Sequence, residues 1–169
     1  KYDPLHFPVM GVLAHHPALA KGFLRFNNQI LFGGALSPRL RELAILRVAL
    51  NRRSPFEYGE HVRIALDNDI TQAEIDAVAG GNEAFDGADR LVLRAVDELL
   101  AEGRMGRTWD ALVAELGKHA AIEVIFVVGA YSTLAMAFDT WGLPPSEGAA
   151  PLPRPSRSRG PKSGTRIEA

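Results

Sequence analysis

The sequence contains no cysteine among its 169 residues. This absence excludes disulfide bonds, thiolate metal sites and every reaction that proceeds through a cysteine thiolate. An excess of charge is also lacking, because 19 Lys and Arg stand against 20 Asp and Glu and the formal net charge is -1. A balanced chain gives no global electrostatic argument for binding nucleic acid or an acidic membrane surface. We therefore expect neither partner.

Strand-like alternation of apolar and polar residues is missing as well, whereas signals for helix starts are frequent. Ser-Pro pairs at 37–38 and 54–55 place a capping serine before a proline in the first helical turn. Thr71 and Glu74 have the spacing of a capping box. These signals predict an all-α protein. The expected helices cover about residues 17–32, 38–50, 55–68, 71–78, 88–102, 108–116 and 120–140.

Two of these helices have apolar residues on every side, the one that contains RELAILRVAL (41–50) and the one at 120–140. A small domain can bury one such helix at its centre. Burial of a second one suggests that subunits pack against each other, so the sequence predicts a homo-oligomer.

Long apolar runs of membrane-spanning length are lacking too. The longest, 122–138, contains Glu123, Ser132 and Thr133 and falls short of the roughly 20 residues that a span needs. No N-terminal stretch has the layout of a signal peptide. We expect a cytoplasmic protein with one helical domain at 1–143. Residues 144–169 hold six of the eleven prolines and a charge of +3, which predicts a flexible tail.

The stretch SPFEYGEH (54–61) gathers several polar residues at one helix start. Ser54 and Glu57 have the spacing of a second capping box, which is a purely structural explanation. A direct chemical role for Glu57 is the alternative, and the sequence does not decide between them. Glu60 is expected to face solvent.

His61 lies on the same helix where a polar turn meets an apolar stripe, and it is either a core histidine or a proton-transfer group. Glu42 is the second unusual residue, because Ile45 and Leu46 flank it one turn later. A buried carboxylate needs a partner. Arg39 is one candidate. His61 is the other, because the two helices are joined by a short turn and should pack antiparallel.

Glu42, Ser54, Glu57 and His61 together match the spacing E-x11-C-x2-C-x3-H, with both cysteines replaced. This pattern resembles the alkylhydroperoxidase-D-like (AhpD-like) branch of the carboxymuconolactone decarboxylase superfamily, and the likeness extends over about residues 5–143. The resemblance implies an orthogonal bundle of six to seven helices that forms trimers or hexamers. Thiol-dependent peroxidase activity, which belongs to cysteine-bearing members, is excluded here because a serine and a carboxylate cannot form a disulfide.

The cysteine-free decarboxylases that this chain resembles need no metal or organic cofactor, and we expect none. The resemblance implies an enzyme for a small carboxylated or lactone substrate, with His61 as general acid/base and Glu42 as its partner. Residues that we expect to contact the substrate are Glu57, Tyr58, Arg47 (with Arg25 as a second choice) and His15 (or its neighbour His16).

Two other functions stay open at this point. The protein could be a non-catalytic oligomer that binds a small ligand or serves assembly, because loss of both cysteines is also what a retired redox enzyme would show. A metal site is the third possibility, since carboxylate and imidazole ligands suit Fe, Mn or Zn. Its ligands would be Glu42, Glu57, His61 and either His15 or His16.

Overall fold

Proline and capping residues begin the helices close to where the sequence predicts them. In the computed structural model, which describes residues 8–154, the Ser37 hydroxyl accepts a hydrogen bond from the Leu40 amide at 3.3 Å. Thr71 and Glu74 form the predicted capping box. Every regular element in the described part of the chain is a helix, so the all-α prediction is confirmed. The helices are α1 (Pro8–Leu13), α2 (Pro17–Phe32), α3 (Pro38–Arg52), α4 (Pro55–Leu66), α5 (Gln72–Val78), α6 (Gly87–Glu102) and α7 (Thr108–Trp141).

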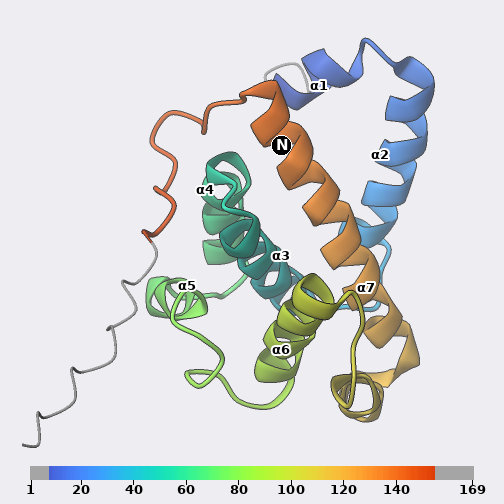
Figure 1. Cartoon of the computed structure of the whole chain (residues 1–169), viewed down its shortest axis with the longest axis vertical. Coiled ribbons are helices and arrows are strands. Elements are labelled where there is room, and N and C mark those ends of the chain that lie inside the picture. Colours follow the sequence, from blue (N-terminus) through green and yellow to red (C-terminus); the bar gives the residue numbers. More distant parts are fainter. Residues whose placement is uncertain (1–7, 155–169) are drawn as a thin grey trace, which may run out of the picture.

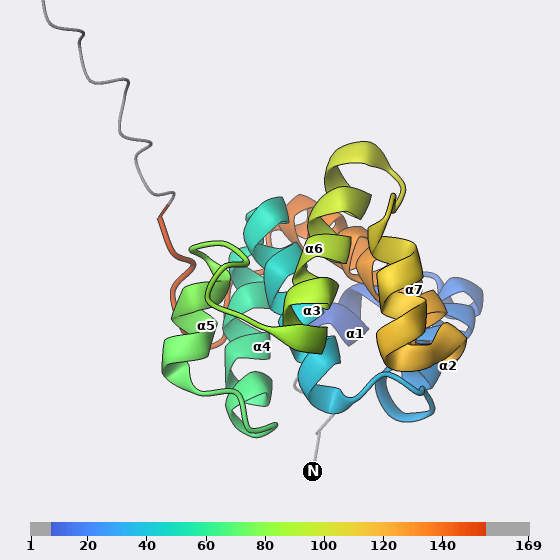
Figure 2. The same cartoon turned by 90° about the horizontal axis from the view of Figure 1, so that it is seen from below.

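Helix α3 is the central element. It lies between α4 and α5 on one side and α7 on the other (Figure 2), and it packs against α6 as well. Its apolar residues divide between two cores because they point in opposite directions. Leu43, Leu46 and Ala49 pack with α4 and α5, whereas Ala44 and Ile45 pack with α7. All five are fully buried, as expected for a helix that is apolar on every side.

Helix α7 combines the two predicted segments 108–116 and 120–140 into one element with a kink. The break is at Gly117, whose φ of 79° and ψ of 162° lie outside the helical region. Glycine accepts a positive φ at little cost because it has no Cβ. The length and apolar composition of α7 would also suit a membrane span, but half of its most apolar stretch is buried inside the protein. That burial is consistent with a core helix.

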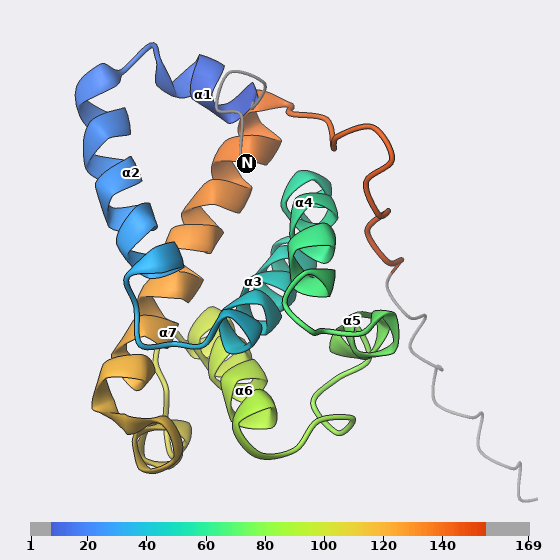
Figure 3. The same cartoon turned by 180° about the vertical axis from the view of Figure 1, so that it is seen from behind.

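Helices α1 and α2 form an arm along α7, on the side away from α5 (Figures 1 and 3). Phe26 of α2 meets Phe126 of α7 edge to face, with ring centroids 6.0 Å apart. Helices α2 and α7 leave large apolar side chains exposed to solvent. These are Leu19, Phe26 and Phe32 on α2 and Ile122, Ile125, Phe126, Met136 and Trp141 on α7, which we call the arm face.

The chain after α7 returns past α4 toward α5 (Figure 1). Ala150 and Leu152 pack against the core that α3, α4 and α5 share. A Cβ atom at Gly59 of α4 would lie 2.8 Å from the Cβ of Ala149, so the absence of a side chain there permits this close approach. Residues 155–169, the larger part of the predicted flexible tail, lie outside the described residues.

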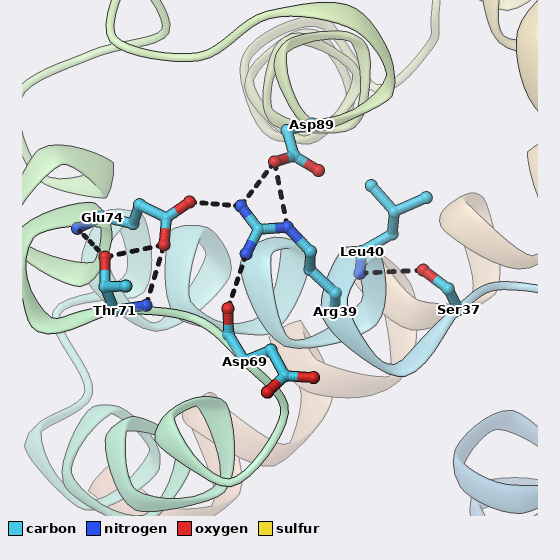
Figure 4. Close-up of polar contacts among 7 residues, drawn as sticks. All are labelled: Ser37, Arg39, Leu40, Asp69, Thr71, Glu74 and Asp89. Atoms are coloured by element: carbon cyan, nitrogen blue, oxygen red, sulfur yellow. Dashed lines mark hydrogen bonds and ion pairs between the residues drawn. The ribbon is translucent and has the colours of Figure 1, made fainter.

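Arg39 links three helices at the end of α3 (Figure 4). Its guanidinium donates to Asp89 of α6 at 2.7 and 3.1 Å, to Glu74 of α5, and to the carbonyl of Asp69 at 3.0 Å. Hydrogen bonds from Arg39 and Thr71 lower the pKa of Glu74 to about 2. This Arg39 network ties α3, α5 and α6 together.

Candidate functional site

The Glu42–His61 pair lies where α3 and α4 pack against each other. The two helices form an antiparallel hairpin, and Arg53 makes the turn in the left-handed conformation with φ 58°. Nδ1 of His61 lies 2.7 Å from Oε2 of Glu42. The Glu42 side chain is 1% exposed and that of His61 is 12% exposed. The contact predicted from the sequence is therefore present, at the buried side of the hairpin.

Arg39, the other proposed partner of Glu42, is held in the Arg39 network and does not contact this carboxylate. Arg41 approaches it instead, with Nε 3.4 Å from Oε1 of Glu42. The sequence reasoning missed Arg41. The available signal was a second charged residue directly beside Glu42, in a segment with apolar residues on every side of the helix.

Helix α7 forms the wall behind His61. The ring of Tyr131 meets the imidazole edge to face, with centroids 5.0 Å apart and an interplanar angle of 87°. The second ring nitrogen of His61, Nε2, makes no hydrogen bond to any residue between 8 and 154. The pair therefore presents one fixed nitrogen to Glu42 and one nitrogen that can exchange a proton with a ligand.

The predicted capping box at Ser54 and Glu57 is wrong. Ser54 makes no side-chain cap, and its hydroxyl donates to Oδ1 of Asp139 on α7 at 3.1 Å. Glu57 is 1% exposed, and neither carboxylate oxygen has a hydrogen-bond partner among the described residues. Burial, and then the charge of Asp139, raise the pKa of Glu57 well above its usual 4.5. The packing of α7 on α4 explains the difference, because it covers the first turn of α4 and removes Glu57 from water.

Glu60 is also buried, with 7% of its surface exposed, so the expectation that it faces solvent is wrong. One of its oxygens, Oε1, has no hydrogen-bond partner in the described part of the chain, and Arg63 lies at the edge of ion-pair distance at 4.0 Å. The chain that returns after α7 packs on α4 beside it, next to Gly59. Local helical spacing could not show that this segment covers the outer side of α4.

The remaining predicted contact residues do not meet the pair. Tyr58 is buried in the core with α3 and α5, and desolvation raises its pKa. Arg47 pairs with Asp97 of α6 at 2.8 and 2.9 Å and also donates to the carbonyl of Val78. None of the interactions found for residues 8–154 joins the remaining candidates to Glu42 or His61. These are His15 and Arg25, which are exposed, and His16, which caps α2 by accepting from the Leu19 amide at 3.3 Å.

The four-ligand metal site is not assembled. No group of three or more His, Asp or Glu side chains within residues 8–154 lies close enough together to hold a metal ion. What the structure does assemble is a contact of both Arg41 and His61 with the Glu42 carboxylate. Glu57 lies one helical turn before His61 on α4, and its buried carboxyl has no hydrogen-bond partner among residues 8–154.

The spacing of Glu42, Ser54, Glu57 and His61 resembles a family pattern, and comparison with known proteins finds the same family. Residues 17–99, which include Glu42 and His61, match the carboxymuconolactone decarboxylase family. No curated protein sequence matches the chain. A solved structure from Agrobacterium tumefaciens, a protein of unknown function described as a candidate antioxidant defence protein AhpD, superposes with a TM-score of 0.70. It covers 79% of this chain and 94% of its own at 17% identity, which shows a shared fold alone. Residues 17–99 of this cysteine-free chain thus match the carboxymuconolactone decarboxylase family, and its all-α fold is of the AhpD-like type.

Proposed function

We propose that the protein is a cofactor-independent proton-transfer enzyme of the decarboxylase or lyase type, acting on a small carboxylated or lactone substrate. The contact of His61 with Glu42 at 2.7 Å is the observation that carries the proposal. Glu42 orients the imidazole and fixes which nitrogen faces it. Nε2 of His61 is then the atom that donates or accepts the proton.

In a decarboxylation, the bond between the carboxylate carbon and its neighbour breaks and carbon dioxide leaves. The electron pair remains on the neighbouring carbon and spreads into an adjacent carbonyl as an enolate. His61 donates its Nε2 proton to that carbon, and solvent returns a proton to the imidazole. Apolar surroundings favour this step, because the charge is more dispersed in the transition state than in the carboxylate.

The chemistry of cysteine-bearing relatives supports no alternative at this site. Ser54 and Glu57 stand at the two positions of the thiols in the family pattern, and the chain has no cysteine elsewhere. A thiol–disulfide cycle requires two sulfur atoms. Proton transfer requires only the imidazole and its partner, both of which are present.

The test is a set of small 3-keto acids and carboxylated lactones, followed by NMR in deuterated water. We expect the wild type to release carbon dioxide or to exchange a proton beside a carbonyl for at least one of them. His61→Gln should lower that rate about 10²- to 10⁴-fold, the usual contribution of a general acid or base. His119→Gln, at an exposed position of α7, is the matched control and should keep the wild-type rate. Wild-type inactivity on the whole set, or equal rates in His61→Gln, would contradict the proposal.

The exposed apolar residues of the arm face support a second proposal, that the chain self-associates as a trimer or hexamer. Phe126 is 52% exposed, and Phe23, Phe26 and Ile125 line a groove of about 440 Å³ beside it. Contiguous apolar surface of this kind marks an interface. A non-catalytic oligomeric binding or assembly protein, the alternative function, would also use this face.

We further propose a cytoplasmic location, consistent with the burial of α7 inside the fold.

Sedimentation tests self-association directly. Phe126→Glu should shift the protein to monomers, because it replaces an exposed aromatic ring of the arm face with a charge. Leu66→Glu on α4 is the matched control, since Leu66 is similarly exposed at 47% but lies outside the arm face. A monomeric wild type, or an unchanged oligomer in Phe126→Glu, would exclude this interface.

A further inference from the structure

Arg41 is a buried arginine whose guanidinium has few partners among the described residues. Its side chain is 10% exposed, and its one charged neighbour is Oε1 of Glu42 at 3.4 Å from Nε. That Nε atom is buried and makes no hydrogen bond. The two terminal nitrogens of Arg41 have neither a hydrogen bond nor an ion pair to any residue in the described range 8–154.

The other two arginines that point inward from α3 behave differently. Arg39 contacts two carboxylates and a carbonyl, and Arg47 contacts both oxygens of Asp97 and a carbonyl. A guanidinium carries five N–H donors, and a buried donor without an acceptor is costly. Of the three guanidinium nitrogens of Arg41, Nε is the one that is buried without a hydrogen-bond partner among the described residues. Glu42 cannot supply acceptors for all the N–H donors of Arg41, because its second oxygen already contacts His61 at 2.7 Å.

A carboxylate is the ligand that suits the N–H donors of Arg41 that have no acceptor among the described residues. The planar fork of an arginine matches the two oxygens of a carboxylate in a bidentate contact. Arg41 and His61 touch the two oxygens of one and the same Glu42 carboxylate. Arg41 and the imidazole are therefore neighbours across this one carboxylate.

We propose that Arg41 is the anchor for a substrate carboxylate, and that this carboxylate stays on the product. The inference rests on the proposed proton-transfer function and names its substrate class. An ion pair with the departing carboxylate would weaken as its charge moves into the enolate, so it would stabilise the ground state more than the transition state. An ion pair with a second, retained carboxylate keeps its strength throughout. The substrate class is thus a small acid with one retained carboxylate near the reacting carbon.

The probe is levulinate, a keto acid with a single carboxylate, and the neutral control ligand is its amide. Dissociation constants would be measured by NMR titration of the full chain. We expect levulinate to bind the wild type and the amide to bind at least tenfold more weakly. Arg41→Gln should weaken levulinate binding by tenfold or more and abolish this preference over the amide. Arg90→Gln, at an exposed arginine on α6, should bind as the wild type does.

Arg41→Lys keeps the charge but removes the fork, and it covers the case in which Arg41→Gln does not fold. We expect it to bind levulinate more weakly than the wild type while still preferring it to the amide. If Arg41 merely balanced the charge of Glu42, both variants would lose thermal stability with no change in that preference, and the proposal would be overturned. Failure of the wild type to bind levulinate would overturn it as well.

These results are separate from the test of His61. His61→Gln should still bind levulinate, because Arg41 is intact. If Arg41-dependent binding is found and no proton transfer is, the anchor stands and the enzyme proposal fails. If proton transfer depends on His61 but levulinate binding does not depend on Arg41, the proposal that Arg41 anchors a carboxylate is wrong and the enzyme proposal stands.

Discussion

Two arginines, two residues apart on α3, lie in opposite kinds of polar cluster. Arg39 lies in a network at the edge of the fold, where its side chain is 31% exposed and is bonded to partners from the α4–α5 connection, α5 and α6. Arg41 lies deeper, at 10% exposure, beside Glu42 and His61. The first cluster satisfies its polar groups, whereas the second leaves several of them without partners.

This difference indicates what each region does. A satisfied, partly exposed network adds modestly to stability and positions helices. Unpartnered polar groups in the interior are costly, and native proteins contain few of them. Here Nε of Arg41 and both oxygens of Glu57 are buried and have no hydrogen-bond partner among residues 8–154. These atoms support our proposal that the region around Glu42 and His61 is the functional one.

The largest effect is expected from Glu42→Gln. An amide no longer favours one orientation and tautomer of His61, so the rate of proton transfer should fall by about 10²- to 10³-fold. Arg39→Gln is the matched comparison from the other cluster, and it should leave the rate unchanged while it lowers the unfolding free energy by about 1 kcal/mol. Equal rates in wild type and Glu42→Gln would remove the catalytic distinction between the clusters.

A smaller effect is expected from Glu57→Gln in the pH dependence of stability. The unfolded carboxyl loses its proton near its ordinary pKa of 4.5, whereas burial keeps the folded one protonated to higher pH. The folded state therefore binds more protons above pH 4.5, and its stability falls as pH rises toward the raised pKa. The slope approaches about 1.4 kcal/mol per pH unit at most. Urea unfolding between pH 4.5 and 8 should show this fall in the wild type, and Glu57→Gln should flatten it.

The control for this measurement is Glu115→Gln, at an exposed position of α7. It should keep the wild-type slope. The same slope in Glu57→Gln as in the wild type would mean that Glu57 is ionised in the folded protein, with a partner that compensates its burial.

The smallest effect belongs to Glu74, and it has the opposite sign. Its pKa is lowered to about 2 by Arg39 and Thr71, so its contribution is complete above pH 4.5 and is lost as pH falls from 4.5 toward 2. Acid titration of thermal stability should show a steeper loss in the wild type than in Glu74→Gln. The loss should also shrink in high salt, because this ion pair is partly exposed. An unchanged acid limb in Glu74→Gln would show that the Arg39 network adds nothing to stability.

The helices and the Glu42–His61 contact could be predicted from the sequence because both depend on local rules. Prolines and capping residues define where helices begin. The joining of the two predicted segments 108–116 and 120–140 into one helix kinked at Gly117 was not predicted. A short turn makes α3 and α4 antiparallel, which brings inward residues from both into contact. Neither inference needs knowledge of distant segments.

The choice among Arg39, Arg41 and Arg47 of α3 needed the tertiary structure. Arg39 and Arg47 contact acidic residues on α5 and α6, between 35 and 50 positions later in the chain, so helical spacing alone could not assign their partners. Glu57 is the second case. Its position as the third residue of a helix predicts a cap, and it becomes an unpartnered buried acid because α7 covers it.

By itself, the sequence determined an all-α chain without thiol chemistry, and it offered His61 as one of two candidate partners of Glu42. It could do so because periodicity and capping act over a few residues, and the absence of cysteine holds for any fold. Only the tertiary structure decided which polar groups lie in the interior without partners. That outcome depends on which helices cover which faces, and segments such as α7, far away in the chain, supply the cover.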